Sequence, residues 1–464
     1  MLQTVAALAT CNPYTEERSK LEKRALGKAY EDLKEGIPAF IQNGDRISEK
    51  AERLGERIRE AYRRGETLPE SQLDPYRKLV YFLVYHGMSE EMDQFIGSFR
   101  EGKRNPSARS LYRDLEGRLE HWLWIEGTWI VRPAKTGHLL ALFFQIRRAF
   151  FNTHHFIIGQ SEPARRLRAQ IWNSVFTHDL DLYRDLLFDR LNDVTTLITG
   201  PSGSGKELVA RAVAYSRYLS FQEETHTFAE PLAQLLYPIN LSALSETLIE
   251  SELFGHRKGA FTGALLDRMG YFETCGSSGS IFLDEIGETS TAIQVKLLRV
   301  LQSREFQRIG ETDTRNFQGK LIAATNRNLE EEIHRGRFRE DFYFRLCSDR
   351  IQTPRLAALL EGNPRELVRL VEFIAQRMVG PAEAEPLTEK VCQWIQDHLG
   401  ATYSWPGNFR ELEQCFRNIL VQGHYYPPGV PPAGEDPEQS RIEAGEATNR
   451  ELLSWYYTKA FQKT

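Results

Sequence analysis

A glycine-rich segment that follows a short apolar run is the feature that most restricts the fold of this chain. Residues 200–206 read Gly-Pro-Ser-Gly-Ser-Gly-Lys, which fits G-x-x-x-x-G-K, and they lie between the apolar run 194–199 and a helical pattern. Glycines here let successive backbone N–H groups point at an anion, and a helix N-terminus adds partial positive charge. The residues predicted to hold a nucleotide are Gly200, Pro201, Ser202, Gly203, Ser204, Gly205, Lys206 and Glu207.

Polar residues end two further apolar runs. Asp284 and Glu285 follow residues 280–283, and Asn326 follows residues 321–325. Strands that alternate with helices predict an α/β fold around a mostly parallel sheet, in which ligands bind at the carboxyl ends of the strands. A single acid there could merely cap a helix. The pair suggests two roles, in which Asp284 holds Mg²⁺ and Glu285 polarises the attacking water of a nucleotide hydrolase.

Glu207 departs from the general phosphate-loop pattern. A Ser or Thr normally stands at this position and offers its hydroxyl to Mg²⁺. Taken by itself, this departure weakens the prediction from the loop. The carboxylates after the second apolar run, 78 residues beyond Lys206, restore it, because that separation leaves room for intervening strands and helices.

The first 150 residues or so show helical apolar patterns and no cluster of chemically active side chains. The clearest stripe runs from Ile47 to Ala61 at spacings of four and three, and Gly65 can end that helix. We expect such stripes to form a core rather than cofactor contacts. Further elements are predicted with Ser89 and Ser107 as helix N-caps, over residues 122–131 as a hairpin and over 139–151 as a buried helix.

From about Phe156 to Leu420 the chain resembles the AAA+ domain of sigma-54-dependent transcription activators, the bacterial enhancer-binding proteins. The similarity begins at residues 157–161, and Glu207 agrees with this family's phosphate loop, whereas Pro201 departs from its usual acid. The resemblance implies an AAA+ P-loop NTPase core with a helical lid, preceded here by an α-helical N-terminal domain. It also implies ATP and Mg²⁺ as cofactors.

The family's most specific motif is intact. After residues 250–258 the chain reads GAFTGA, and the resemblance implies that this loop grips sigma-54 in the RNA polymerase holoenzyme. The residues alone favour a mobile loop whose aromatic side chain can dock on a partner, or else a buried turn anchored by Phe261. The predicted sigma-54 residues are Gly259, Ala260, Phe261, Thr262, Gly263 and Ala264.

Three more segments match the family in order. Residues 324–326 resemble sensor I, where Asn326 would sense the γ-phosphate, and residues 405–412 resemble sensor II, where Arg410 would contact the nucleotide. Arg339 and Arg345 lie in a segment that resembles the arginine fingers, which reach a neighbouring subunit's nucleotide. The resemblance therefore implies a homo-oligomeric ring, expected to be a hexamer. Without it, both arginines read as surface salt-bridge formers.

The resemblance divides the chain into four parts. We expect a helical regulatory domain over 1–155, the ATPase core over 156–354, a helical lid over 355–425, and a linker with a final helix over 426–464. Residues 179–192 and 221–235 look like insertions, and the lid connection at 353–357 departs from the family's usual sequence. The N-terminal part does not resemble a phosphoacceptor receiver domain, because that fold would alternate strands and helices.

The end of the chain and its composition bear on partners. Residues 448–463 resemble the helix that leads into a DNA-binding helix-turn-helix, but no two-helix element follows. DNA binding by this chain is therefore not expected, and the chain is either truncated or relies on a partner. The 59 basic and 64 acidic residues give a net charge of −5. No apolar run approaches the roughly 18 residues of a membrane helix, and five unpaired-looking cysteines fit a reducing cytoplasm.

Two rival functions stay open at this point. The chain could be an ATP-binding regulator or scaffold that does not contact sigma-54, or a remodelling ATPase that acts on a different protein with the same loop. The leading prediction is an ATP-hydrolysing transcription regulator that remodels a sigma-54 promoter complex.

Overall fold

The computed structural model describes residues 1–31, 43–100, 107–229, 235–427, 448 and 452–453. The linker and final helix predicted over 426–464 lie almost wholly outside these residues. The chain forms two compact units, residues 1–369 and 370–464. No helix in the described part of the chain is both long and apolar enough to cross a membrane.

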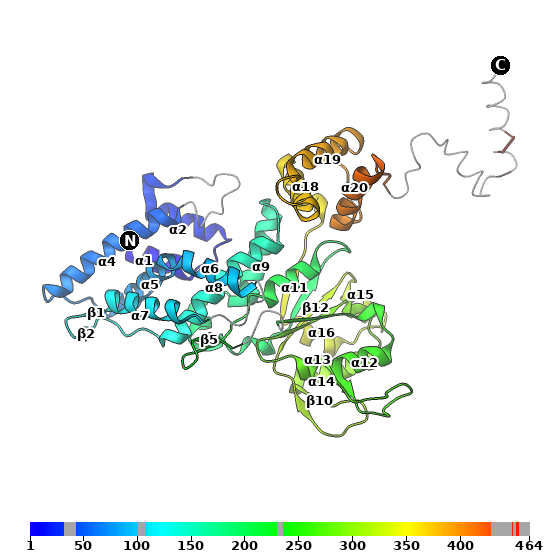
Figure 1. Cartoon of the computed structure of the whole chain (residues 1–464), viewed down its shortest axis with the longest axis horizontal. Coiled ribbons are helices and arrows are strands. Elements are labelled where there is room, and N and C mark those ends of the chain that lie inside the picture. Colours follow the sequence, from blue (N-terminus) through cyan, green and yellow to red (C-terminus); the bar gives the residue numbers. More distant parts are fainter. Residues whose placement is uncertain (32–42, 101–106, 230–234, 428–447, 449–451, 454–464) are drawn as a thin grey trace, which may run out of the picture. The chain divides into compact units, whose positions relative to one another are not determined.

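The N-terminal region is helical, as the apolar stripes predict. Ile47 and Ala51 are fully buried on one helix, and Leu111, Leu115 and Leu119 are buried on another. Figure 1 shows this region in blue to cyan. Its helices are α1 (Leu2–Thr10), α2 (Glu16–Leu26), α4 (Gly44–Arg63), α5 (Glu70–Gly87), α6 (Ser89–Arg100), α7 (Arg109–Leu123) and α8 (Thr136–Phe156).

Two predicted helix caps are wrong, while the predicted hairpin is confirmed. Ser89 is itself the first residue of α6, and its hydroxyl donates to the carbonyl of His86 at 2.8 Å. The helix after Ser107 begins one residue later than expected, with Ala108 as its N-cap. Short-range turn chemistry of this kind competes with the capping role of serine. The hairpin consists of β1 (Trp124–Ile125) and β2 (Thr128–Trp129).

A five-stranded sheet forms the centre of the following region, and all its strands are parallel. The strand order is β13-β3-β12-β9-β6. This confirms the predicted α/β fold with its mostly parallel sheet. The strands are β3 (Thr196–Thr199), β6 (Leu236–Asn240), β9 (Ser280–Asp284), β12 (Lys320–Thr325) and β13 (Asp349–Gln352).

Both faces of the sheet are covered. Successive strand residues point to opposite faces, so Leu197 and Leu283 belong to one apolar cluster, whereas Ile198 and Phe282 belong to the other. Runs buried on both faces explain why the strands read as continuous apolar segments. The helices of this region are α9 (Glu162–Phe176), α10 (Leu180–Leu182), α11 (Lys206–Ala214), α12 (Glu246–Phe254), α13 (Tyr271–Thr274), α14 (Thr291–Ser303), α15 (Leu329–His334), α16 (Glu340–Leu346) and α17 (Leu356–Leu360).

The second predicted insertion forms a hairpin that packs into the N-terminal core. It consists of β4 (Phe221–Gln222) and β5 (Thr227–Phe228). The ring of Phe228 stacks on Phe144 of α8 with centroids 4.1 Å apart. The hairpin thus supplies apolar surface to helices that lie far earlier in the sequence.

The remaining helices are α18 (Pro364–Val379), which crosses the boundary between the two units, and α19 (Ala384–His398) and α20 (Asn408–Gln422) of the second unit. Leu412, Phe416 and Ile419 are buried along one side of α20. All five cysteines are free, but only Cys275 and Cys415 are fully buried. The other three are half-buried.

Candidate nucleotide site

The glycine-rich segment forms a tight turn between β3 and α11. Gly205 has a φ of 87° and is the N-cap of α11, a conformation that side chains with a Cβ rarely adopt. Lys206 is the first residue of the helix, and its ammonium donates to the carbonyls of Gly200 and Pro201 at 3.2 Å each. The Ser204 hydroxyl lies 2.6 Å from that of Thr353, which follows β13. The loop is thus held by the neighbouring strand end.

The three predicted polar strand ends meet at one edge of the sheet. β12 lies between β3 and β9, so Asn326 is placed beside the carboxylates that end β9. The backbone N–H of Asn326 donates to Oε2 of Glu285 at 3.4 Å. Glu285 has a φ of 56° in the left-handed region, which costs about 1–3 kcal/mol for a non-glycine residue and clusters at functional sites.

Electrostatics place Asp284 near both Lys206 and Glu207. Burial and the negative charge of Glu285 raise the pKa of Asp284, and Glu207 adds to this, while the Glu285 N–H and the Lys206 charge oppose it. A cation beside Asp284 would relieve that repulsion, so the carboxylate fits a magnesium ion. No group of three or more His, Cys, Asp or Glu side chains within the described residues could hold a metal by itself. An ion here would therefore share its ligands with phosphates and water.

A cavity of about 820 Å³ lies along the same edge. Its size is within the range of about 300–1,000 Å³ that is usual for ligand sites. The ends of β3 and β13, the residues that follow β12 and the helix α9 line it, and Gly200, Pro201 and Asn326 are among its residues. Lys206, Asp284 and Glu285 do not line it, so the cavity includes Asn326 but extends to one side of the other three.

Sequence patterns missed a carboxylate that holds the segment where the family resemblance begins. The side chain of Glu366 is fully buried and accepts the backbone N–H groups of Gln160 at 2.7 Å and Ser161 at 3.0 Å. Gly159 has a φ of 105°, and a Cβ there would lie 2.2 Å from Glu366 Oε1. No local signal predicts a contact between residues 206 positions apart.

The side chains of the other predicted nucleotide contacts are exposed. Arg339 pairs with Asp341 at 2.7 Å and is 42% exposed, and the Arg345 side chain is exposed. Glu207 pairs with Arg211 one turn along α11 at 2.6 Å. Arg410 lies on α20 in the second unit. The roles predicted for these residues stay predictions.

The GAFTGA segment forms a closed turn between β7 (Gly255–His256) and β8 (Arg268–Met269). The N–H of Gly259 donates to the carbonyl of Ala264 at 2.8 Å. Phe261 is half-buried with its ring 4.9 Å from that of His256, and Thr262 is exposed. The leucines that follow, Leu265 and Leu266, are 78% and 75% exposed. Phe261 therefore lies at the loop's base rather than in the core.

Residues 308–311 form hydrogen bonds and an ion pair with the residues just before this loop. The N–H of Arg257 donates to the carbonyl of Ile309, and the N–H of Ile309 donates to that of Gly255, both at 3.0 Å. The Arg257 guanidinium also pairs with Asp267 at 2.7 Å and with Glu311 at 2.6 Å. Residues 308–311 are thus joined to the base of the GAFTGA segment.

Part of this chain is similar in sequence to known proteins. Residues 183–352 match the family described as the Sigma-54 interaction domain. The Nif-specific regulatory protein of Azotobacter vinelandii is 38% identical over 281 residues, which are 59% of this chain and 46% of that protein. The transcriptional regulatory protein ZraR of Salmonella typhimurium is 41% identical over 239 residues, 50% of this chain and 49% of that one. The chain thus spans less than half the length of these relatives.

Among solved structures, NtrX from Brucella abortus in complex with ADP is similar with a TM-score of 0.44 and 23% identity, over 71% of this chain and 69% of that one.

Proposed function

We propose that this chain, in which residues 183–352 match the Sigma-54 interaction domain, hydrolyses ATP to remodel a sigma-54 RNA polymerase complex. The observation that carries the proposal is the meeting of Asp284, Glu285 and Asn326 at the sheet edge where α11 begins with Lys206. Phosphoryl transfer needs these parts together: a phosphate cradle, a metal-holding carboxylate and a group that orients water.

Each residue has a distinct role in the proposed reaction. The N–H groups of residues 200–206 and the Lys206 ammonium bind the phosphates, and Asp284 holds Mg²⁺, which neutralises charge on the transferring group. Glu285 orients the attacking water, and its backbone conformation fixes where its carboxylate points. Asn326 contacts the γ-phosphate. Arg339 and Arg345, both exposed, reach the nucleotide of the next subunit in a ring.

The Glu285→Gln variant tests the catalytic assignment. The amide keeps the size of the side chain but cannot accept a proton, so phosphate release should fall by at least about 100-fold while ATP still binds. Glu288→Gln is the matched control, because Glu288 lies in the same turn and pairs with Arg327. Unchanged turnover in Glu285→Gln would show that the assignment is wrong.

The Thr262→Ala variant tests the partner. We expect it to hydrolyse ATP normally and to lose activation of sigma-54-dependent transcription from a purified polymerase. Thr225→Ala, at an exposed threonine of the inserted hairpin, is the control. If Thr262→Ala still activates transcription, the loop does not act on sigma-54, and remodelling of another protein becomes the better proposal.

A further inference from the structure

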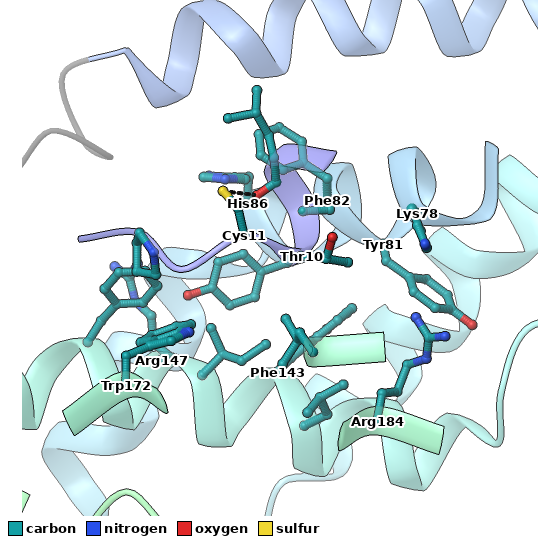
Figure 2. Close-up of a pocket in the computed structure, with 18 of the residues that line it drawn as sticks. Thr10, Cys11, Lys78, Tyr81, Phe82, His86, Phe143, Arg147, Trp172 and Arg184 are labelled. Atoms are coloured by element: carbon teal, nitrogen blue, oxygen red, sulfur yellow. Dashed lines mark hydrogen bonds between the residues drawn. The ribbon is translucent and has the colours of Figure 1, made fainter. Parts of the chain in front are cut away.

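We infer that a cavity in the N-terminal helical region is a binding site for a compact, uncharged molecule, and that α8 transmits its occupancy to the helix that begins the phosphate site. The cavity measures about 90 Å³ and lies between α1, α5 and α8, with Trp172 of α9 and Arg184 completing its wall. Figure 2 shows these side chains converging on one space from helices of both the N-terminal region and the ATPase region.

The wall is mainly aromatic and aliphatic. Tyr81, Phe82, Phe143 and Trp172 are labelled in Figure 2, and all four are buried. Aromatic walls contribute large apolar surface at little conformational cost, and most small-molecule sites combine such walls with a few polar groups. The body of a fitting ligand is therefore an apolar ring or branched chain.

The charges in the wall are already balanced. Four cations line the cavity, and the described residues that line it include no acid. Because each cation has a carboxylate partner, none of them calls for an anionic ligand. The pairs are Arg18 with Glu22 at 2.7 Å, Lys78 with Asp181 at 2.6 Å, Arg147 with Asp93 at 2.6 Å and Arg184 with Asp181 at 2.8 Å.

Two polar groups in the wall have hydrogen-bonding capacity to offer a ligand. The buried Tyr85 hydroxyl interacts with the guanidinium of Arg147, which can only donate, and no acceptor for the hydroxyl's own hydrogen is found within the described residues. Burial, together with the nearby charges of Arg18 and Arg147, lowers the pKa of His86 to about 3. The imidazole is therefore neutral and presents one donor and one acceptor. A single hydroxyl or carbonyl on the ligand would satisfy these groups.

Opposite faces of α8 contact the cavity and the phosphate-site helix. Leu142, Phe143 and Ile146 line the cavity. Gln145, Arg148 and Asn152, spaced three and four apart, share the other face and hold the chain just beyond the C-terminal end of α11. Their bonds run from Gln145 to the carbonyl of Ser216 at 3.0 Å, from Asn152 to that of Tyr215 at 2.9 Å, and from Arg148 to those of Tyr215 at 3.1 Å and Arg217.

A rotation or shift of α8 on ligand binding would therefore move the C-terminal end of the helix whose first residue is Lys206. Packed helices shift as rigid units rather than deforming. The binding step stands without the proposed ATPase, whereas the transmission step rests on it.

Binding is tested on the full chain with benzyl alcohol and cyclohexanol as uncharged probes, toluene as the analogue without a hydroxyl, and benzoate as the anion. We expect saturable binding of the two alcohols, seen as a concentration-dependent rise of the unfolding midpoint and in ligand-observed NMR, with benzoate at least tenfold weaker. Tyr85→Phe should weaken benzyl alcohol about fivefold and leave toluene within twofold. Tyr76→Phe is the control, since that hydroxyl lies on the same helix but bonds to the carbonyl of Trp122.

The binding proposal is overturned if neither alcohol binds saturably, or if neither Tyr85→Phe nor His86→Phe alters the affinity for benzyl alcohol. For transmission, saturating benzyl alcohol should change the ATP turnover of the natural chain at least twofold. Asn152→Leu should keep the binding and lose that response, whereas Phe151→Leu, at an exposed position of α8, should keep both. An unaltered turnover in the natural chain overturns transmission. A chain that binds the probe but never hydrolyses ATP refutes the proposed ATPase instead.

Discussion

The two ends of α11 are held in different ways. At the N-terminal end, the contiguous residues 200–206 form the turn before the helix, and the Lys206 ammonium donates to the carbonyls of Gly200 and Pro201. Beyond the C-terminal end, side chains of α8, which lie 63 to 71 positions earlier in the sequence, donate to the carbonyls. The first arrangement has the fixed spacing that the proposed phosphate loop requires. The second depends on how two helices that are distant in sequence pack together.

The helix dipole explains the chemistry at each end. Partial positive charge at a helix N-terminus favours anions, and partial negative charge at the C-terminus favours cations. Arg148 is fully buried, and burial lowers the pKa of its guanidinium to about 9. It is stabilised by carbonyls at the negative end of α11. A charge is thus expected at both ends, carried by a ligand at one and by the protein at the other.

The largest effect is expected at the N-terminal end. Lys206→Ala should lower ATP turnover by at least about 100-fold, because the ammonium is a preorganised donor to developing charge. The thermal unfolding midpoint should also fall somewhat, because the carbonyls of Gly200 and Pro201 lose this donor. Lys296→Ala is the control, since Lys296 forms a surface pair with Glu250. Phosphate release within threefold of the natural chain would contradict a phosphate-binding role.

Arg148→Met should disturb the C-terminal end mainly through stability. The substitution leaves the carbonyls of Tyr215 and Arg217 without this partner, so the free energy of unfolding should fall by about 1–3 kcal/mol. Arg147→Met, on the adjacent position of α8, loses a more exposed pair with Asp93 and should cost less than about 1 kcal/mol. If urea unfolding shows equal losses in the free energy of unfolding for the two variants, the buried bonds of Arg148 stabilise the chain no more than the exposed pair of Arg147.

Lys320, the first residue of β12, should also make the free energy of unfolding depend on pH. Burial lowers the pKa of Lys320 to about 7; Asp349 opposes this, and the charges of Arg217 and Arg304 add to it. The unfolded lysine titrates near 10.4, so between pH 7 and 9 the unfolded state binds more protons and stability rises with pH. The slope from this group is at most about 1.4 kcal/mol per pH unit.

Lys320→Met isolates that contribution. Urea unfolding of the natural chain and the variant should be measured at pH 6, 7, 8 and 9. We expect the stability advantage of the Met variant over the natural chain to narrow as pH rises, because the natural chain gains stability as Lys320 loses its charge. A difference independent of pH would mean that Lys320 stays charged in the folded chain.

The smallest effect is expected for Glu207→Ala. Glu207 and Arg211 form an exposed pair one turn apart on α11, and such pairs contribute less than about 0.5 kcal/mol. The free energy of unfolding from thermal melts should therefore fall by no more than that amount. The same is expected for Arg211→Ala. A loss well above 1 kcal/mol would show that Glu207 supports the turn at the N-terminal end beyond this ion pair.

The same contrast explains what the sequence could predict. The apolar runs before Gly200, Asp284 and Asn326 predict strands, and parallel strands bring their carboxyl ends to one edge, so this cluster was accessible. Helical stripes such as 47–61 were also readable, because burial repeats with the helical period. The partners of Glu366 and Arg148 were not, since neither residue has a local signature and both act across more than 60 positions. The inserted hairpin was noticed only as extra length, and its packing on Phe144 needed the fold.

The tie between the GAFTGA segment and residues 308–311 has a mechanical consequence. A glycine-containing loop without such contacts would be flexible, so a force on its tip would be absorbed by bending of the loop. Here the backbone hydrogen bonds with Ile309 and the ion pairs of Arg257 make the two segments one stiffer unit. The exposed Leu265 and Leu266 lie directly after the GAFTGA residues in this unit. A force applied at these leucines would be transmitted to α12, which precedes β7, and to Glu273, which pairs with Arg308. One of the three interactions that join the segments, the pair of Arg257 with Glu311, is ionic, so the stiffness should decrease as salt screens its charges.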